Sequence, residues 1–194
     1  MPIMLDLETL GQRAGCAIIS IGACEFDPKA KTIGRTFYGV AAADGAQGKA
    51  GLTVDPKTWD WWQKQSAEAR AVFSDANAVP INVLLTNFVV WADQCKGVSA
   101  DWYAHGASFD FPVLEAVLLA FKFKTPWSFW NCRCTRTLYA LGDVAVNNYR
   151  DASAHNALAD AKAQAQAAIV ALGRIGIARE IVTELTKPEG SESQ

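Results

Sequence analysis

The sequence predicts an α/β fold in which a mixed β-sheet carries helices on both of its faces. Three consecutive segments with strand character open the chain, at residues 3–8, 16–27 and 32–40. Two further strand segments follow at 101–104 and 129–132, and each of them leads into a helical segment. A meander followed by alternating strands and helices indicates both antiparallel and parallel pairing, unlike a doubly wound parallel sheet.

The first strand combines apolar residues with two carboxylates. Successive side chains of a strand point to opposite faces, so the apolar residues at 3, 5 and 7 share one face while Asp6 and Glu8 share the other. The second segment is rich in β-branched and small apolar residues. The turn signal Asp27-Pro28-Lys29 separates it from the third.

Capping residues mark the starts of the first helices. Asp55 followed by Pro56 predicts a helix start, with Asp as the N-cap and Pro at the first helical position. Ser66 followed by Glu68 predicts a second short helix. Pro80 opens a longer helix, in which apolar residues recur at helical spacing.

The remaining elements follow from composition and periodicity. Helices are expected at 111–121 and 133–141, and the alanine-rich run 156–172 predicts one more, because alanine has the highest helix propensity. The connection 41–51, which is rich in Gly, Ala and Asp, is expected to be a mobile loop.

Length and composition exclude several classes of protein. The 194 residues suit one domain, expected to span 1–186 with a polar tail at 187–194. No apolar run approaches the roughly 20 residues that span a bilayer, and no signal peptide is evident, so we expect no membrane partner. Five cysteines without framework spacing favour reduced thiols and a cytoplasmic location. The net charge of −2 argues against a protein that covers long stretches of duplex.

Two carboxylates on one face of a buried strand need a neutralising partner. On an exposed edge strand the D-x-E pair would need none, and this interpretation stays open for the motif alone. Here Asp6 and Glu8 are flanked by apolar residues in the first strand of a mixed sheet. Buried like charges repel and raise their pKa values unless a cation neutralises them. Oxygen ligands favour a hard cation such as Mg²⁺ or Mn²⁺.

Two further motifs offer polar groups. Asp110 lies just past the strand 101–104, where a helix is expected to begin. It is either a simple N-cap or a group at the carboxyl end of a strand, where α/β sheets place ligands. His155 and Asp160 lie five residues apart at the start of the alanine-rich helix. Alone, this spacing is a weak pattern, and His155 is then an ordinary polar residue.

Taken together, the D-x-E motif, Asp110 and the pair His155 and Asp160 resemble the DEDD superfamily of 3'-5' exonucleases. The resemblance is to its His subclass, because Asn and not Tyr stands four residues before Asp160. Four segments are similar, in the same order, to the group of exonuclease A (DexA) of T-even phages, which includes bacterial exoribonucleases. They are WWQKQSAEAR (61–70), GASFDFPVL (106–114), FWNCRCTRT (129–137) and AHNALADAK (154–162).

This resemblance, which covers about residues 3–165, implies a ribonuclease-H-like fold with a five-stranded mixed sheet flanked by helices. It implies hydrolysis of single-stranded nucleic acid from the 3' end, releasing nucleoside 5'-monophosphates, in a bacterium or a phage-infected host. DNA is favoured by the phage relatives. A 3'-5' exoribonuclease and a catalytically silent nucleic-acid-binding module are the alternatives. A homodimer is consistent with the relatives, although the sequence carries no interface signature.

The resemblance also implies roles for the polar residues. Asp6, Glu8, Asp110 and Asp160 would hold two Mg²⁺ or Mn²⁺ ions. The two cations would activate the attacking water and stabilise the leaving 3' oxygen. His155 would take the proton from that water.

Several residues near these motifs are candidates for contact with the substrate. In related nucleases the stretch that matches Thr9 and Leu10 contacts the terminal nucleotide; the alternative is a plain exit from the strand. Ser108 and Phe109 stand beside Asp110 and are comparable candidates, with Phe109 favoured as a core residue.

A cluster of tryptophans precedes Gln65. Trp59, Trp61 and Trp62 cannot all face one core at helical spacing, so at least one is expected near the surface. Exposed aromatic faces can stack on bases, which makes Trp61, Trp62 and Gln65 candidate substrate contacts. Core packing is the alternative.

Four nearby positions have no assigned role. His105 stands where many family members have Asn, and Cys134 stands where many have Asp. Neither matches a metal-ligand position, so these departures leave the substrate preference open. Arg133 and Arg136 either reach phosphates or cap and solvate a helix.

Overall fold

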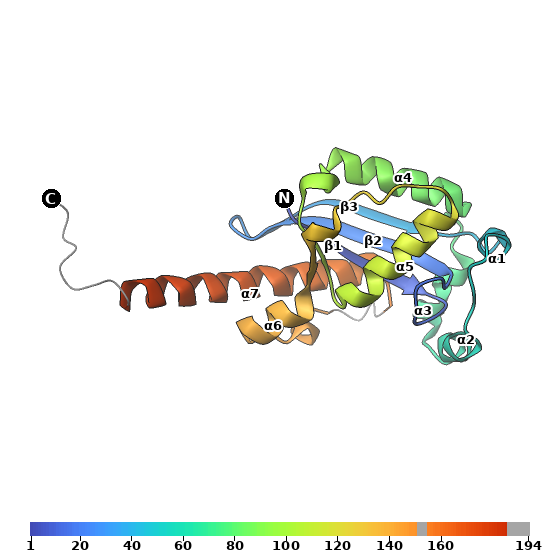
Figure 1. Cartoon of the computed structure of the whole chain (residues 1–194). Helices are drawn as coiled ribbons and strands as arrows, with labels where there is room; N and C mark the ends of the chain where they lie inside the picture. The colour runs from blue at the N-terminus through green and yellow to red at the C-terminus, as the bar shows by residue number, and fades with distance from the viewer. Residues whose placement is uncertain (151–154, 186–194) are drawn as a thin grey trace.

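A five-stranded mixed sheet with strand order β3-β2-β1-β4-β5 forms the centre of the fold (Figure 1). The computed structural model describes residues 1–150 and 155–185, with side chains up to residue 176. β1, β2 and β3 form an antiparallel meander, and β4 and β5 run parallel to β1. The strands are β1 (Ile3–Thr9), β2 (Ile18–Asp27), β3 (Thr32–Val40), β4 (Trp102–Ala104) and β5 (Cys132–Cys134). The predicted mixed sheet is confirmed, with β1 in its middle.

Helices cover both faces of the sheet. The apolar side of β1 packs against α4 (Ile81–Gln94) and α5 (Ala107–Ala120) in the larger core. Met4, on the opposite side of β1, packs against alanines of α7 (Ala157–Leu185) and against α6 (Thr135–Gly142). Figure 1 shows α7 crossing the face of the sheet opposite to α4 and α5. The carboxylate side of β1 therefore faces α7.

A glycine in β2 allows α7 to lie close to the sheet. Gly22 is the cross-strand partner of Asp6. A Cβ at this position would lie 2.1 Å from the backbone carbon of Ala157 and 2.2 Å from the backbone nitrogen of Leu158. Any side chain would push the start of α7 away. Gly22 thus sets the distance between β1 and the residues that open α7.

The predicted caps of the short helices are confirmed. The Asp55 carboxylate accepts a hydrogen bond from the Lys57 amide at the start of α2 (Pro56–Gln63). The Ser66 hydroxyl accepts one from the Ala69 amide in α3 (Ala67–Arg70). Four 3-10 turns complete the secondary structure of the described chain: η1 (Ala71–Ser74), η2 (Gly97–Ser99), η3 (Phe129–Asn131) and η4 (Val146–Tyr149).

The connection 41–51, expected to be a mobile loop, includes regular secondary structure. It contains the one-turn helix α1 (Ala46–Lys49). The Gln47 side chain donates to the Ile18 carbonyl at 2.8 Å and accepts from the Ile18 amide at 2.9 Å. This amide pairing anchors the connection to the start of β2, a contact that composition does not encode.

Two predicted boundaries in the second half are wrong. The strand expected at 129–132 is β5 at 132–134, because residues 129–131 form the turn η3. The helix expected from 111 begins at Ala107, directly after Gly106, whose φ of 124° makes the turn out of β4. Asp110 is therefore inside α5 and is not its N-cap.

The alanine-rich helix is longer than predicted. α7 continues through Gly173 and Gly176 to Leu185, although each glycine costs about 1 kcal/mol relative to alanine in a helix. Figure 1 shows its last turns extending beyond the sheet. The expected boundary at 186 and the tail at 187–194 lie outside the described residues. Within the described part, no helix is long and apolar enough to cross a membrane.

Candidate metal centre and substrate cavity

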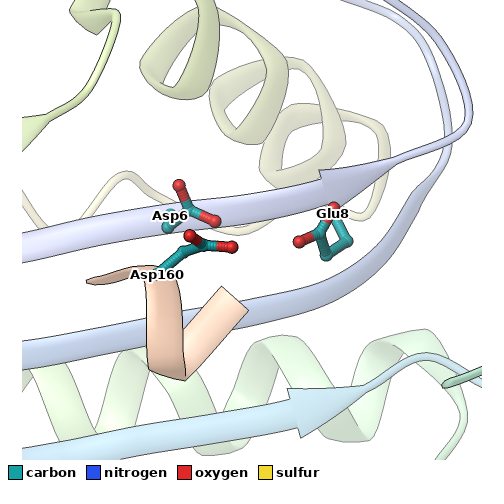
Figure 2. A group of neighbouring side chains, drawn as sticks. All are labelled: Asp6, Glu8 and Asp160. Atoms are coloured by element: carbon teal, nitrogen blue, oxygen red, sulfur yellow. The ribbon is translucent and has the colours of Figure 1, made fainter. Parts of the chain in front are cut away.

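Three carboxylates converge beside the carboxyl end of β1. Carboxylate oxygens of Asp6, Glu8 and Asp160 all lie within 4.8 Å of one another. Figure 2 shows Asp6 and Glu8 on one strand, with Asp160 facing them from α7. Glu8 is 8% exposed, and the side chain of Asp160 is 12% exposed. We call these three residues, together with Asp110, the carboxylate cradle.

Asp110 completes the cradle from the first turn of α5, where it is buried. β4 pairs with β1 only over residues 3–5. Burial raises the pKa of Asp110, and the backbone of Asp110 itself and of Leu7, which lies beyond this pairing, act to lower it. Asp110 is not part of the group within 4.8 Å, but its charge raises the pKa of both Asp6 and Glu8. The four carboxylates therefore share one electrostatic site.

Burial and repulsion between neighbouring charges raise the pKa of carboxyls in the cradle. Burial, and then repulsion by Asp110, Glu8 and Asp160, raise the pKa of Asp6 well above its usual value. The same two causes raise the pKa of Glu8 to about 8. Burial raises the pKa of Asp110 to about 7. A divalent cation would neutralise these groups without protons, and an all-oxygen donor set fits a hard cation.

Asn156 starts α7 and so positions Asp160. Its side-chain oxygen accepts hydrogen bonds from the amides of Leu158 and Ala159, at 3.1 and 3.0 Å. This is the geometry of an N-cap, which leaves Asp160 in the first turn of the helix. The cap and the close contact at Gly22 together bring Asp160 to β1.

Two residues that sequence reasoning missed contact the cradle. The Arg150 guanidinium lies 3.0 Å from Asp160, from Nε to Oδ1. The Gln164 amide donates to Asp6 at 2.7 Å, from Nε2 to Oδ1. Gln164 follows Asp160 by four residues, so helical periodicity could have placed it on the same face. No sequence signal identifies Arg150.

A cavity of about 370 Å³ opens beside Glu8. Among the predicted substrate contacts, it is lined by Thr9, Trp61, Trp62 and Phe109. The Trp62 indole is buried and donates to the Thr9 carbonyl at 2.9 Å, whereas Trp61 is 43% exposed. The lining also contains residues that sequence reasoning missed: Gln12, Lys57 and Thr58. The cavity thus lies between the end of β1, after Glu8, and the helix α2, which carries the tryptophans.

The other predicted contacts lie elsewhere. Leu10 packs between the larger core and a small cluster around Trp62. The Gln65 side chain donates to the Trp61 carbonyl at the end of α2. Ser108 is exposed on the first turn of α5. Trp59 is 42% exposed and packs edge-on against Phe73.

His155 lies beside the tryptophans of α2. Its ring packs edge-on against Trp61 and Trp62, with ring centroids 4.9 and 5.8 Å apart. Its backbone φ is 67°, a left-handed conformation that turns the chain into α7. The ring also lines a second cavity of about 460 Å³, together with Tyr38 and Asn156. His155 therefore lies against Trp61 and Trp62 and lines a different cavity from the one beside Glu8.

The unassigned residue His105, together with Thr135, connects β4 to α6. The Thr135 hydroxyl donates to the Ala104 carbonyl at 3.2 Å, so it accepts from Nδ1–H of His105 at 3.1 Å. The His105 ring also stacks on Tyr139, at 5.4 Å between centroids. Burial, and then the charges of Arg136 and Arg150, lower the pKa of His105. These contacts indicate a structural role for His105.

The two candidate arginines are in different environments. Arg133 pairs with Asp101 at 2.9 Å and also donates to the Trp130 carbonyl. The Arg136 guanidinium lies against Gly106 and lowers the pKa of Asp110. Arg136 therefore acts on the electrostatics of the cradle, whereas Arg133 ties β5 to the loop before β4.

Comparisons with known proteins agree with this architecture. The family described as the 3'-5' exoribonuclease Rv2179c-like domain matches residues 1–172. The exodeoxyribonuclease of Enterobacteria phage T4 is 29% identical over 157 residues, which cover 69% of this chain and 68% of the phage protein.

Solved structures of exonucleases share the fold. Exonuclease X, solved with 5' overhanging duplex DNA, superposes with a TM-score of 0.55 at 17% identity, over 91% of this chain and 93% of that one. The nuclease domain of 3'hExo, a DEDDh family member bound to rAMP, superposes with a TM-score of 0.55 at 12% identity, over 88% of this chain and 92% of that one. E. coli exonuclease I, solved with a dT13 oligonucleotide, superposes with a TM-score of 0.64 at 14% identity, over 94% of this chain but only 44% of that one. The predicted ribonuclease-H-like fold is confirmed, and the chain belongs to the Rv2179c-like 3'-5' exoribonuclease domain family.

Proposed function

We propose that this exonuclease degrades single-stranded nucleic acid from the 3' end by a two-metal mechanism, and that it prefers DNA. The observation that carries the proposal is the carboxylate cradle, in which three carboxylates lie within 4.8 Å of one another and the fourth, Asp110, raises the pKa of Asp6 and Glu8. It borders a cavity of about 370 Å³ with an exposed tryptophan in its wall. An acidic centre beside such a cavity suits a phosphodiester bond at a chain end.

In this mechanism Asp6, Glu8, Asp110 and Asp160 hold two divalent cations, Mg²⁺ or Mn²⁺. When bound, such a pair supplies an activated water nucleophile and stabilises the leaving 3' oxygen. The four side chains come from β1, α5 and α7, so their separation is fixed by packed elements. Glu8, Asp110 and Asp160 are buried and Asp6 is partly buried, which strengthens the electrostatic interactions at the site.

His155 is the general base in this proposal. An imidazole accepts the proton of an attacking water in many hydrolases. The edge-on contacts with Trp61 and Trp62 limit the orientations of the ring. Trp61 and Trp62 of α2 therefore line the cavity and also contact the ring of His155.

The 3'-terminal nucleotide occupies the cavity beside Glu8. The exposed ring of Trp61 offers a stacking surface to a base, and Phe109 lines the cavity with it. Lys57 adds a positive charge to the lining, where a phosphate can be held. Thr9 completes the wall between these residues and Glu8.

RNA is the second candidate substrate, because the family model is described as an exoribonuclease. DNA is favoured by the phage T4 relative, which is an exodeoxyribonuclease.

We also propose a cytoplasmic site of action, which the five free cysteines support. The homodimer expected from relatives is tested by measuring the mass in solution.

The test uses DNA and RNA oligonucleotides of one sequence, labelled at the 5' end, with Mg²⁺, Mn²⁺ or EDTA. We expect a ladder that shortens from the 3' end with either cation and none with EDTA. Asp110→Ala and His155→Ala should abolish or strongly reduce cleavage. Asp93→Ala, at an exposed aspartate of α4, is the matched control and should cleave normally.

Three results would contradict the proposal. A folded wild-type protein that cleaves no substrate contradicts the nuclease activity. Cleavage in EDTA contradicts the metal mechanism. A faster ladder on RNA than on DNA reverses the substrate preference and leaves the mechanism intact.

A further inference from the structure

Gln164 is an uncharged side chain buried against the carboxylate cradle. It is 1% exposed and lies four residues after Asp160, on the same face of α7. Its Nε2 donates to Asp6 Oδ1 at 2.7 Å. The Gln164 amide thus places a neutral donor against one oxygen of the Asp6 carboxylate.

The other end of the Gln164 amide is an unpaired acceptor. Within the residues that the structure describes, Oε1 is buried without a hydrogen-bond partner. Turning the amide over would bring this oxygen against the Asp6 carboxylate, where two acceptors repel. The orientation of the amide is therefore set by Asp6, and Oε1 stays at the inner wall of the cradle as an acceptor.

The backbone of Gln164 is held independently of its side chain. The Tyr139 hydroxyl, from α6, donates to the Gln164 carbonyl at 2.6 Å. Tyr139 is buried, so this hydrogen bond is shielded from water. The amide is thus presented to Asp6 from a fixed point on α7.

We propose that Gln164 is a positioning residue of the metal centre, which holds one oxygen of Asp6 and leaves the other to bind the cation. Its Oε1 accepts a hydrogen bond from a donor that enters with the cation, of which water is the simplest. This inference rests on the proposed function. Partners that orient metal ligands commonly change metal affinity or activity by about 10- to 100-fold when they are lost.

The test is the affinity for Mn²⁺ of Gln164→Met, measured by calorimetry and by the Mn²⁺-dependent rise in melting temperature. Methionine fills a similar volume but neither donates to Asp6 nor leaves an unpaired oxygen. We expect affinity about 10- to 100-fold weaker than wild type, with an unchanged or higher melting temperature in EDTA. Gln166→Met, at an exposed position of the same helix, is the matched control and should bind Mn²⁺ normally.

Nuclease kinetics distinguish positioning from packing. If Gln164 acts through Asp6, Gln164→Met should regain much of its maximum rate at saturating Mn²⁺. In an Asp6→Asn background the same substitution should cause little further loss, because the two changes remove one interaction. Gln164→Asn is a second variant with a shorter amide that cannot reach Asp6, and it should behave like Gln164→Met.

Unchanged Mn²⁺ affinity in both variants would overturn the inference, and so would an equal further loss in the Asp6→Asn background. If neither variant folds, Gln164 is structural and the inference fails as well. A wild-type protein that binds no Mn²⁺ overturns the metal centre itself. The two failures are therefore distinguishable.

Discussion

The metal-free protein is expected to lose stability as the pH rises through neutrality. The folded pKa of Glu8 is about 8, against an ordinary value of 4.5, and that of Asp110 is about 7, against 3.8. Between the ordinary and the raised values, the folded state keeps protons that the unfolded chain has released. Stability is therefore full below the ordinary pKa values and is lost as the pH rises through the folded ones.

The magnitude follows from the pKa of Glu8. Moving it from 4.5 to about 8 corresponds to about 5 kcal/mol, at about 1.4 kcal/mol for each pH unit. Glu8 is 8% exposed, so solvent screens this effect little. Asp110 and Glu8 repel each other, so their effects overlap and do not add. We expect a total loss of about 3–5 kcal/mol, a large share of the usual 5–15 kcal/mol.

One half-buried group, His105, acts in the opposite direction. The lowered pKa of His105 means that its folded form prefers the neutral ring. This contribution rises with pH until the ordinary histidine value near 6.5 is passed, and then stays constant. The interval from about pH 6.5 to 8 therefore reports the cradle without this offset.

The assay is urea unfolding at a series of pH values, in EDTA and in saturating Mn²⁺. In EDTA the free energy of unfolding should fall across this interval. In Mn²⁺ the fall should disappear, because the cation stabilises the ionised carboxylates. Glu8→Gln removes the main titrating group and should flatten the EDTA curve. A constant or rising free energy in EDTA would refute the reasoning, as would an equal fall in Mn²⁺.

Three further predictions concern contacts around the cradle. Arg150→Gln should tighten Mn²⁺ binding in calorimetry by about two- to fivefold, because the guanidinium competes for Asp160 in a partly exposed ion pair worth about 0.5–1 kcal/mol. Gly22→Ala should lower the free energy of unfolding by about 1–3 kcal/mol and weaken Mn²⁺ binding, since its Cβ collides with α7. Gly48→Ala is the control, because a Cβ at Gly48 would meet open space. Equal effects of the two substitutions would contradict this prediction. Trp62→Phe should cost about 1–3 kcal/mol in urea unfolding, because a buried strand carbonyl loses its donor.

The sheet and the charge pattern of β1 could be predicted because both depend on local periodicity. Alternation alone places Asp6 and Glu8 on one face, and three apolar neighbours make that strand central. Caps such as Asp55 are local as well, since the side chain bonds to an amide two residues later. Such signals can be read from the sequence because they involve residues that are neighbours in the chain.

The unpredicted features depend on contacts between distant residues. Gln164 meets Asp6 across 158 positions of sequence, and no local pattern encodes that meeting. The anchoring of Gln47 to Ile18 is similar, and it turns an expected loop into a helical turn. The N-cap interpretation of Asp110 is wrong because α5 begins earlier, at Ala107, after a positive-φ turn at Gly106. Where tertiary contacts fix a boundary, propensity is a weak guide.

Arg150 and Gln164 contact the cradle in different environments, because Arg150 is partly exposed on its outer side and Gln164 is buried on its inner side. Arg150 is 42% exposed and carries a full charge, so it must give up Asp160 when a cation binds there. Gln164 is 1% exposed and neutral, so it can keep Asp6 in place whether or not a cation is bound. A charged group on the inner side would compete with the cation permanently, because burial leaves it no solvent to move into. The partly exposed ion pair can therefore open when a cation binds, whereas the buried hydrogen bond to Asp6 can persist.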